Sequence, residues 1–127
     1  MASRGLKIFF DGGCCPNPGP IEAAVVVRGT THLYEDMGSG TSNDAEWLAL
    51  ILALELAQSL GLNDIILVGD ALDVIQEAKR TLNSGRAKPG HASTFLSLAV
   101  KAPRVRMRWI KRTQNLAGIA LAARHRR

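Results

Sequence analysis

Three acidic residues stand where the sequence could support chemistry on a phosphate. Asp11 follows an apolar run, Asp70 ends a second one, and Glu46 lies near the start of a long Ala/Leu-rich segment. If these ends meet at one edge of a sheet, the carboxylates repel one another unless a cation lies between them. Oxygen ligands at this density suit Mg²⁺ or Mn²⁺, and two such ions can hold a phosphodiester for attack by water. The residue types therefore indicate a metal-dependent reaction at a phosphate ester.

Each acid taken alone also has a purely structural explanation. Asp11 with Gly12 is a turn signal, and Asn43 with Glu46 has the spacing of a helix capping box. Asp70 can cap the helix that follows it. The shared placement of the acids at the ends of elements is what favours one common site.

The elements that must position these acids are readable from periodicity. Apolar and β-branched runs predict strands, and the Ala/Leu-rich segment predicts a helix that is buried on several sides. Near the C-terminal end arginines alternate with Val105, Met107 and Trp109, which predicts a half-buried strand with these three residues inward. Pro103 is expected to end the helix before it. The predicted strands are residues 6–10, 21–28, 31–37, 64–70 and 104–112, and the predicted helices are 45–60, 71–82, 92–102 and 115–127.

The order of these elements predicts the fold class. Three leading antiparallel strands followed by alternating helices and strands favour an α/β chain with a mixed sheet and helices packed on it. A length of 127 residues is typical of one domain, so residues 1–127 are expected to form a single unit.

The charge distribution indicates the kind of partner. The first 77 residues carry 11 acids and 3 bases, whereas the last 50 carry 13 bases and no acid. Such asymmetry favours a polyanion bound to the C-terminal half, although a basic, solvated surface is the alternative.

The remaining composition is that of an ordinary globular chain. Apolar residues make up 46% of the sequence, and no apolar stretch is long enough to cross a bilayer. The adjacent Cys14 and Cys15 have neither disulfide nor zinc spacing. We expect a cytoplasmic protein with no membrane partner and no readable protein partner, and a monomer.

Four segments resemble the type 1 ribonuclease H family over almost the whole chain. They are DGGCCPNPGP (11–20), GTSNDAEWLALILAL (40–54), VGDALDVIQ (68–76) and RWIKRTQNLAGIALA (108–122). The resemblance implies a ribonuclease H-like fold, with a five-stranded mixed sheet and helices on both faces. It also implies hydrolysis of the RNA strand of RNA–DNA hybrids with two divalent ions, Mg²⁺ or Mn²⁺, leaving 3′-hydroxyl and 5′-phosphate ends.

The resemblance also assigns roles to individual residues. Asp11, Glu46 and Asp70 match three of the family's four catalytic, metal-binding acids, and the glycines and prolines after Asp11 would let the backbone approach a sugar-phosphate strand. Six further residues match substrate-contacting positions: Asn17 and Asn43 at backbone groups including the 2′-hydroxyls, Thr41 at a phosphate, Gln76 at a base or sugar, Arg112 at a phosphate, and Asn115 near the start of the last helix. A turn or cap role is the structural alternative for the asparagines, Thr41 and Gln76.

The chain departs from the family pattern at the fourth acid. Ile119 stands in its place, or Gly118 if the alignment is shifted by one, and no acid follows Glu77. We expect a weaker site for one ion and a preference for Mn²⁺. Asp73 and His125 are candidate substitutes, although solvent exposure is the simpler expectation for both.

Three functions remain open from the sequence. The first is a metal-dependent endonuclease on RNA–DNA hybrids. The second is a catalytically weak or inactive module that binds hybrid or duplex through the same fold. The third is a nuclease that acts on double-stranded RNA or on a single-stranded end.

Overall fold

The structure is a computed structural model that describes residues 5–102 and 104–125. The predicted break at Pro103 and the last two residues of the predicted C-terminal helix lie outside the described residues. The strands are β1 (Leu6–Cys14), β2 (Gly19–Val27), β3 (Thr30–Tyr34), β4 (Ser39–Gly40), β5 (Asp64–Gly69) and β6 (Arg104–Trp109). The helices are α1 (Ser42–Ser59), α2 (Leu72–Ser84), α3 (His91–Ala99), the 3₁₀ turn η1 (Arg112–Gln114) and α4 (Leu116–Ala123).

The strands form one mixed sheet in the order β3-β2-β1-β5-β6. The pairs β1–β2 and β2–β3 are antiparallel, whereas β1–β5 and β5–β6 are parallel. The two-residue strand β4 pairs with β2 beside this order. The mixed α/β fold predicted from the order of elements is therefore confirmed, with five main strands and one short addition.

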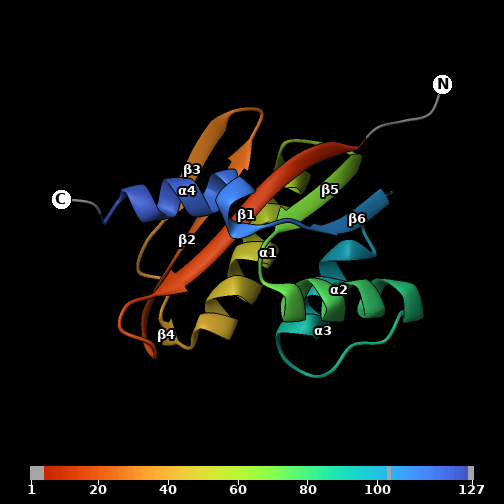
Figure 1. Ribbon diagram of the computed structural model, residues 1–127. Coiled ribbons are helices and arrows are strands. Elements are labelled where there is room, and N and C mark those ends of the chain that lie inside the picture. Colours follow the sequence, from red (N-terminus) through yellow and green to blue (C-terminus); the bar gives the residue numbers. More distant parts are fainter. Residues whose placement is uncertain (1–4, 103, 126–127) are drawn as a thin grey trace.

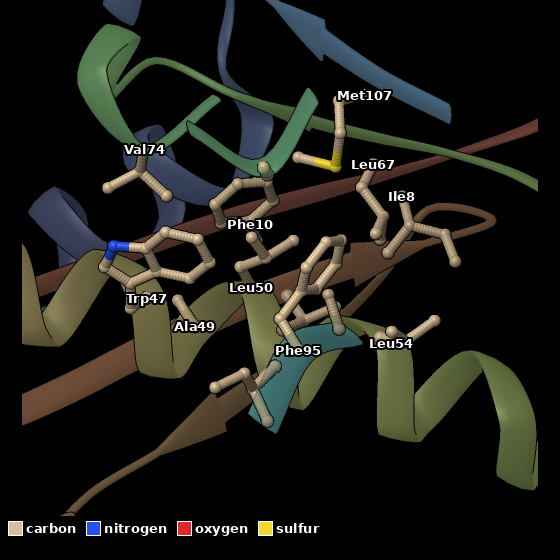
Figure 2. Packing of buried hydrophobic residues seen from close by; sticks show 14 of the residues in the cluster. Ile8, Phe10, Trp47, Ala49, Leu50, Leu54, Leu67, Val74, Phe95 and Met107 are labelled. Atoms are coloured by element: carbon tan, nitrogen blue, oxygen red, sulfur yellow. The ribbon is translucent and has the colours of Figure 1, made fainter. Parts of the chain in front are cut away.

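Helices lie on both faces of the sheet. Figure 1 shows α4 crossing one face over β1 and β2, while α1, α2 and α3 lie on the other side. The larger core fills the α1 side, where Phe10, Leu50 and Phe95 have no exposed surface (Figure 2). A smaller cluster under α4 joins Phe9 to Ala117 and other buried residues of β2 and α4. Burial of each large apolar side chain stabilises such a core by about 1.5–3 kcal/mol.

Strand β1 is longer than the sequence predicts. It continues past Phe10 to Cys14, and Gly12 and Gly13 pair with residues of β2 instead of forming a turn. A Cβ atom on Gly12 would lie 2.0 Å from the carbonyl oxygen of Ala45 in the first turns of α1. Glycine is needed here because the helix packs directly on the strand backbone. The predicted Asp-Gly turn is therefore wrong.

Helix α1 begins three residues earlier than predicted. Thr41 is its N-cap: the Thr41 hydroxyl accepts from the Asp44 N–H at 3.1 Å, and Asp44 Oδ2 accepts from the Thr41 N–H at 2.9 Å. The capping box thus uses Thr41 and Asp44, and the structural alternative, a box of Asn43 and Glu46, is not formed. Glu46 remains available for another role.

The last strand is shorter than predicted. Strand β6 ends at Trp109, and Arg112 opens the turn η1. Met107 faces the larger core as predicted, but Trp109 is 43% exposed, so its predicted inward position is wrong. Its indole Nε1 donates to the Asp70 carbonyl at 3.1 Å, because a strand end leaves this carbonyl free for a side-chain donor.

Among the residues that the structure describes, no helix combines the length and apolarity needed to cross a membrane.

Candidate active site

The three acids predicted to share a site do converge. One carboxylate oxygen from each of Asp11, Glu46 and Asp70 lies within 4.8 Å of the others. They come from β1, from α1 and from the residue directly after β5. Three hard oxygen donors at this separation fit a divalent cation such as Mg²⁺ or Mn²⁺.

The parallel register of β1 and β5 brings two of the acids level. Phe9 pairs with Val68, and Asp11 and Asp70 each follow two residues later. The two acids therefore lie side by side on neighbouring segments of the sheet. Asp70 does not cap α2: the N-cap is Ala71, which makes no side-chain cap bond. The capping explanation for Asp70 is therefore wrong.

Glu46 reaches the cluster because α1 approaches β1 so closely. Its side chain is buried, and Oε1 accepts from the Gly12 N–H at 3.0 Å. The same absence of a side chain at Gly12 that lets α1 pack on β1 exposes this N–H to the glutamate. One glycine thus sets both the helix position and the direction of the carboxylate.

Asn115 holds the carboxylate of Asp70 in position. Its side chain has no exposed surface, and its Nδ2 donates to Asp70 Oδ2 at 2.8 Å and to the Phe10 carbonyl at 3.0 Å. Its Oδ1 accepts from the Ala117 N–H at 3.1 Å and so caps α4. The structure shows the cap role that was the structural alternative for Asn115, and the buried side chain ties α4, β1 and Asp70 together. A contact of Asn115 with substrate remains a prediction.

Two of the three acids have raised pKa values, because burial and neighbouring carboxylates disfavour their charged forms. Burial is the largest cause that raises the pKa of Asp11, and the neighbouring Asp70 raises it further. Burial also raises the pKa of Glu46, and the charge of Asp11 adds to the effect. Groups that resist ionisation beside one another become fully charged when a cation compensates them, so the donor set fits a metal ion.

Two hollows flank the acids. A cavity of about 480 Å³ is lined by Asp11 and Glu46 together with residues of α4, and a second hollow of about 310 Å³ is lined by Glu46, Asp70 and the start of α2. Arg112 lines both. Its side chain is 83% exposed, and its Nη2 lies 3.8 Å from Asp70 Oδ1. A guanidinium in this position can bind a phosphate beside the acids.

No acid of α4 joins the cluster. A Cβ atom on Gly118 would lie 3.5 Å from both Asp11 Oδ2 and Asp70 Oδ2, whereas Ile119 is 47% exposed and lines the larger cavity. The helix position that faces the carboxylates is therefore Gly118, the shifted alternative. Neither Gly118 nor Ile119 carries a carboxylate, so α4 supplies no fourth acid in either alignment.

The two candidate substitutes lie apart from the three acids. Asp73 is exposed on α2 and lines the smaller hollow. His125 lines the larger cavity, where its Nε2 pairs with Glu22 Oε1. Arg124 pairs with the same glutamate at 3.5 Å, so the end of α4 is held on β2. The Glu22 contacts had no signal in the sequence, because they depend on where α4 ends relative to β2.

The other predicted contact residues lie around the start of α1, with one exception. Asn17 Oδ1 accepts from the Ser42 N–H at 3.1 Å, the Thr41 hydroxyl serves the capping box, and Asn43 is exposed and lines the smaller hollow. Gln76 is exposed further along α2 and lines neither hollow. Their contacts with a substrate remain predictions.

Comparisons with known proteins agree with this architecture. Residues 9–125 match the family model described as reverse transcriptase-like. Ribonuclease HI of Halobacterium salinarum is 41% identical over 75 residues, which cover 54% of this chain and 38% of that protein. The matches to this and two further ribonucleases H span less than half of each relative's length.

Two solved structures share the fold. The N-terminal RNase H domain of rv2228c from Mycobacterium tuberculosis superposes with a TM-score of 0.71 at 25% identity, covering 95% of this chain and 96% of that one. LC11-RNase H1, solved in complex with an RNA/DNA hybrid, gives a TM-score of 0.67 at 27% identity, covering 87% and 88%. The chain belongs to the reverse transcriptase-like family, and the relatives and solved structures named above, to which it is similar, are ribonucleases H.

Proposed function

We propose that this chain is a metal-dependent endonuclease that hydrolyses the RNA strand of RNA–DNA hybrids. The observation that carries the proposal is the convergence of Asp11, Glu46 and Asp70 within 4.8 Å at the edge of an open cavity. Support comes from relatives named ribonuclease H and from a structural neighbour solved with an RNA/DNA hybrid.

The three acids would hold Mg²⁺ or Mn²⁺, two ions once substrate phosphates add ligands. A bound divalent ion supplies a nucleophilic hydroxide from water and neutralises charge on the phosphate. The chain's own groups prepare the site for that chemistry. The Gly12 N–H orients Glu46 and Asn115 orients Asp70. The Arg112 guanidinium lies beside Asp70, from where it would donate to a phosphate oxygen.

Hydrolysis in this arrangement is proposed to leave 3′-hydroxyl and 5′-phosphate ends. Asn17 contacts the first turn of α1 and Asn43 lies within that turn, and their amides are proposed to pair with ribose 2′-hydroxyls. Such pairing distinguishes RNA from DNA at a nucleotide. The monomeric state and the cytoplasmic location remain predictions.

The test is a panel of end-labelled substrates: RNA–DNA hybrid, double-stranded RNA and double-stranded DNA, each in Mg²⁺ and in Mn²⁺. We expect cleavage of the RNA strand of the hybrid, and its loss in Asp70→Asn. Asp73→Asn is the matched control, since Asp73 lies three residues on and outside the cluster. Binding of hybrid without cleavage would support the inactive module instead, and preferential cutting of double-stranded RNA would change the substrate class.

A further inference from the structure

The edge strand β6 carries a row of arginines outside the two hollows at the acids. Arg104, Arg106 and Arg108 share one side of the strand, because Met107 between them faces the larger core and side chains alternate. We call these three residues the arginine face. None of them lines either hollow at the acids.

The arginine face lies on an open part of the sheet. In the register of β5 and β6, Arg106 pairs with Ile66 and Arg108 with Val68. On this side of the sheet α4 packs against β1, β2 and β3, and Figure 1 shows it displaced from β6. Ile66 and Val68 are nonetheless buried. The Nε of Arg106 is also buried and has no hydrogen-bond partner among the described residues, whereas the side chains of Arg104 and Arg106 keep 55% and 38% of their surface exposed.

The positive charge of this face is only partly compensated. Asp64 Oδ1 accepts from Arg106 Nη2 at 2.9 Å and lies 3.9 Å from Arg104 Nε. Among the described residues Arg108 forms no ion pair, and Arg104 keeps 55% of its side-chain surface exposed. Three guanidinium groups against one carboxylate leave a net positive strip that suits a polyanion.

We infer that the arginine face of β6 binds the sugar-phosphate backbone of nucleic acid that extends beyond the cleaved phosphate. The spacing supports this occupant. Successive arginines of this face stand two residues apart on the strand, about 6.6 Å from one another, so more than one of them can contact phosphates of the same nucleic-acid strand. Arginine also forms two-pronged hydrogen bonds with phosphate.

The position of β6 relative to the acids supports the same occupant. Trp109 pairs with Gly69 in the parallel ladder, and the Ile110 N–H donates to the Gly69 carbonyl at 3.0 Å. Strand β6 therefore ends beside Asp70, and the chain continues directly to Arg112. A nucleic acid bound at the acids can therefore extend past Arg112 and Lys111 onto the arginine face of β6. The inference depends on the proposed function only in taking nucleic acid as the partner.

The test is binding without cleavage. In an Asp11→Asn background, fluorescence anisotropy measures the affinity for an RNA–DNA hybrid and for a DNA duplex, each about 24 base pairs long, between about 50 and 200 mM salt. The parent is compared with Arg104→Gln/Arg108→Gln. Arg28→Gln is the matched control, since Arg28 is an exposed arginine at the turn between β2 and β3.

Loss of two phosphate contacts should reduce the slope of log affinity against log salt by about 1.8, so over this fourfold rise in salt the parent should lose about tenfold more affinity than the double variant. The loss should occur on both duplexes, because phosphate contacts do not read the sugar. An unchanged slope, or an equal change in Arg28→Gln, would overturn the inference and leave the arginines as a shield for the sheet.

Melting temperatures establish that the double variant is folded. If it is not, Arg108→Gln alone decides the question with an expected slope change of about 0.9, because Arg108 has no ion-pair partner among the described residues to lose. These outcomes are separable from those of the proposed function, since a protein that cuts nothing can still show the arginine-dependent slope.

Discussion

Introducing an acid at Gly118 tests whether α4 faces the carboxylate cluster. A Cβ atom there would lie 3.5 Å from Asp11 Oδ2 and from Asp70 Oδ2, which is ordinary van der Waals contact. Gly118→Asp therefore fits sterically and brings a fourth carboxylate to the other acids. Gly118→Asn is the matched control, because asparagine has the same shape without the charge.

The size of the effect follows from the separation of the charges. Two unit charges about 4 Å apart repel by about 4 kcal/mol at the effective dielectric constant of about 20 that suits such sites. Asparagine and aspartate have similar helix propensities, so this contribution cancels between the two variants. Without metal, Gly118→Asp should therefore be less stable than Gly118→Asn by about 4 kcal/mol at pH 8, which lowers the melting temperature by roughly 15 °C in a domain of this size.

A divalent cation should narrow this difference, because the added carboxylate becomes a ligand. A tenfold tighter Mn²⁺ site would return about 1.4 kcal/mol of the lost stability at saturating metal. Thermal unfolding with and without Mn²⁺, and calorimetric titration of Mn²⁺, measure both effects. If Gly118→Asp and Gly118→Asn melt together and bind Mn²⁺ equally, Gly118 does not face the cluster. A larger response in Ile119→Asp would then restore the alignment that places the fourth acid at residue 119.

Three further predictions follow from the packing and charge of the site. Asn115→Ala removes the cap of α4 and leaves a buried carbonyl unpaired, so the free energy of unfolding should fall by about 3 kcal/mol in a denaturant titration, and an unchanged midpoint would refute its linking role. Gly12→Ala should prevent folding because its Cβ would lie 2.0 Å from the backbone of α1, whereas Gly13→Ala, with its nearest neighbour at 3.7 Å, should melt close to wild type; equal behaviour of the two in circular dichroism would contradict the close approach. The pKa values of Asp11 and Glu46 are raised in the folded state, so without metal the stability that these two groups contribute is greatest below pH 3.8 and falls as the pH rises above 4.5. Melting temperatures without metal should therefore fall less with rising pH in Asp11→Asn than in wild type, and saturating Mn²⁺ should flatten the wild-type decline; an identical pH dependence in the two proteins without metal would contradict this reasoning.

The fold could be predicted from the sequence because the spacing of apolar residues in the strands and helices matches the residues that are buried between the sheet and its helices. Its errors lie where tertiary packing overrides a local signal. The glycines after Asp11 are typical of a turn, yet they continue β1, because α1 needs a strand without a side chain at Gly12. The alternation predicted Trp109 inward, but the residue stands at the strand end, where its exposed indole donates to the Asp70 carbonyl.

The sequence predicted the convergence of the acids but not the contacts that hold them in place. Three acids at element ends indicated convergence, and the parallel register supplied it for Asp11 and Asp70. The cap role of Asn115 was the structural alternative in the sequence, but its link from α4 to β1 could not be predicted, because that contact is visible only once both elements are placed. The choice between Gly118 and Ile119 likewise depends on the rotation of α4, which an eight-residue helix apolar on every side does not specify in its sequence.

The most direct test of the central claim is the rate of RNA cleavage in an end-labelled RNA–DNA hybrid with Mn²⁺, for wild type and for Asp11→Asn. Asparagine keeps the shape of the side chain but removes one of the three converging charges. The arrangement of the acids predicts cleavage of the RNA strand by wild type and a loss of at least about a hundredfold in the variant, as for removal of a group that stabilises charge in the transition state. Equal rates in the two proteins, or no cleavage by either while the hybrid remains bound, would contradict the assignment of this cluster as a catalytic metal site.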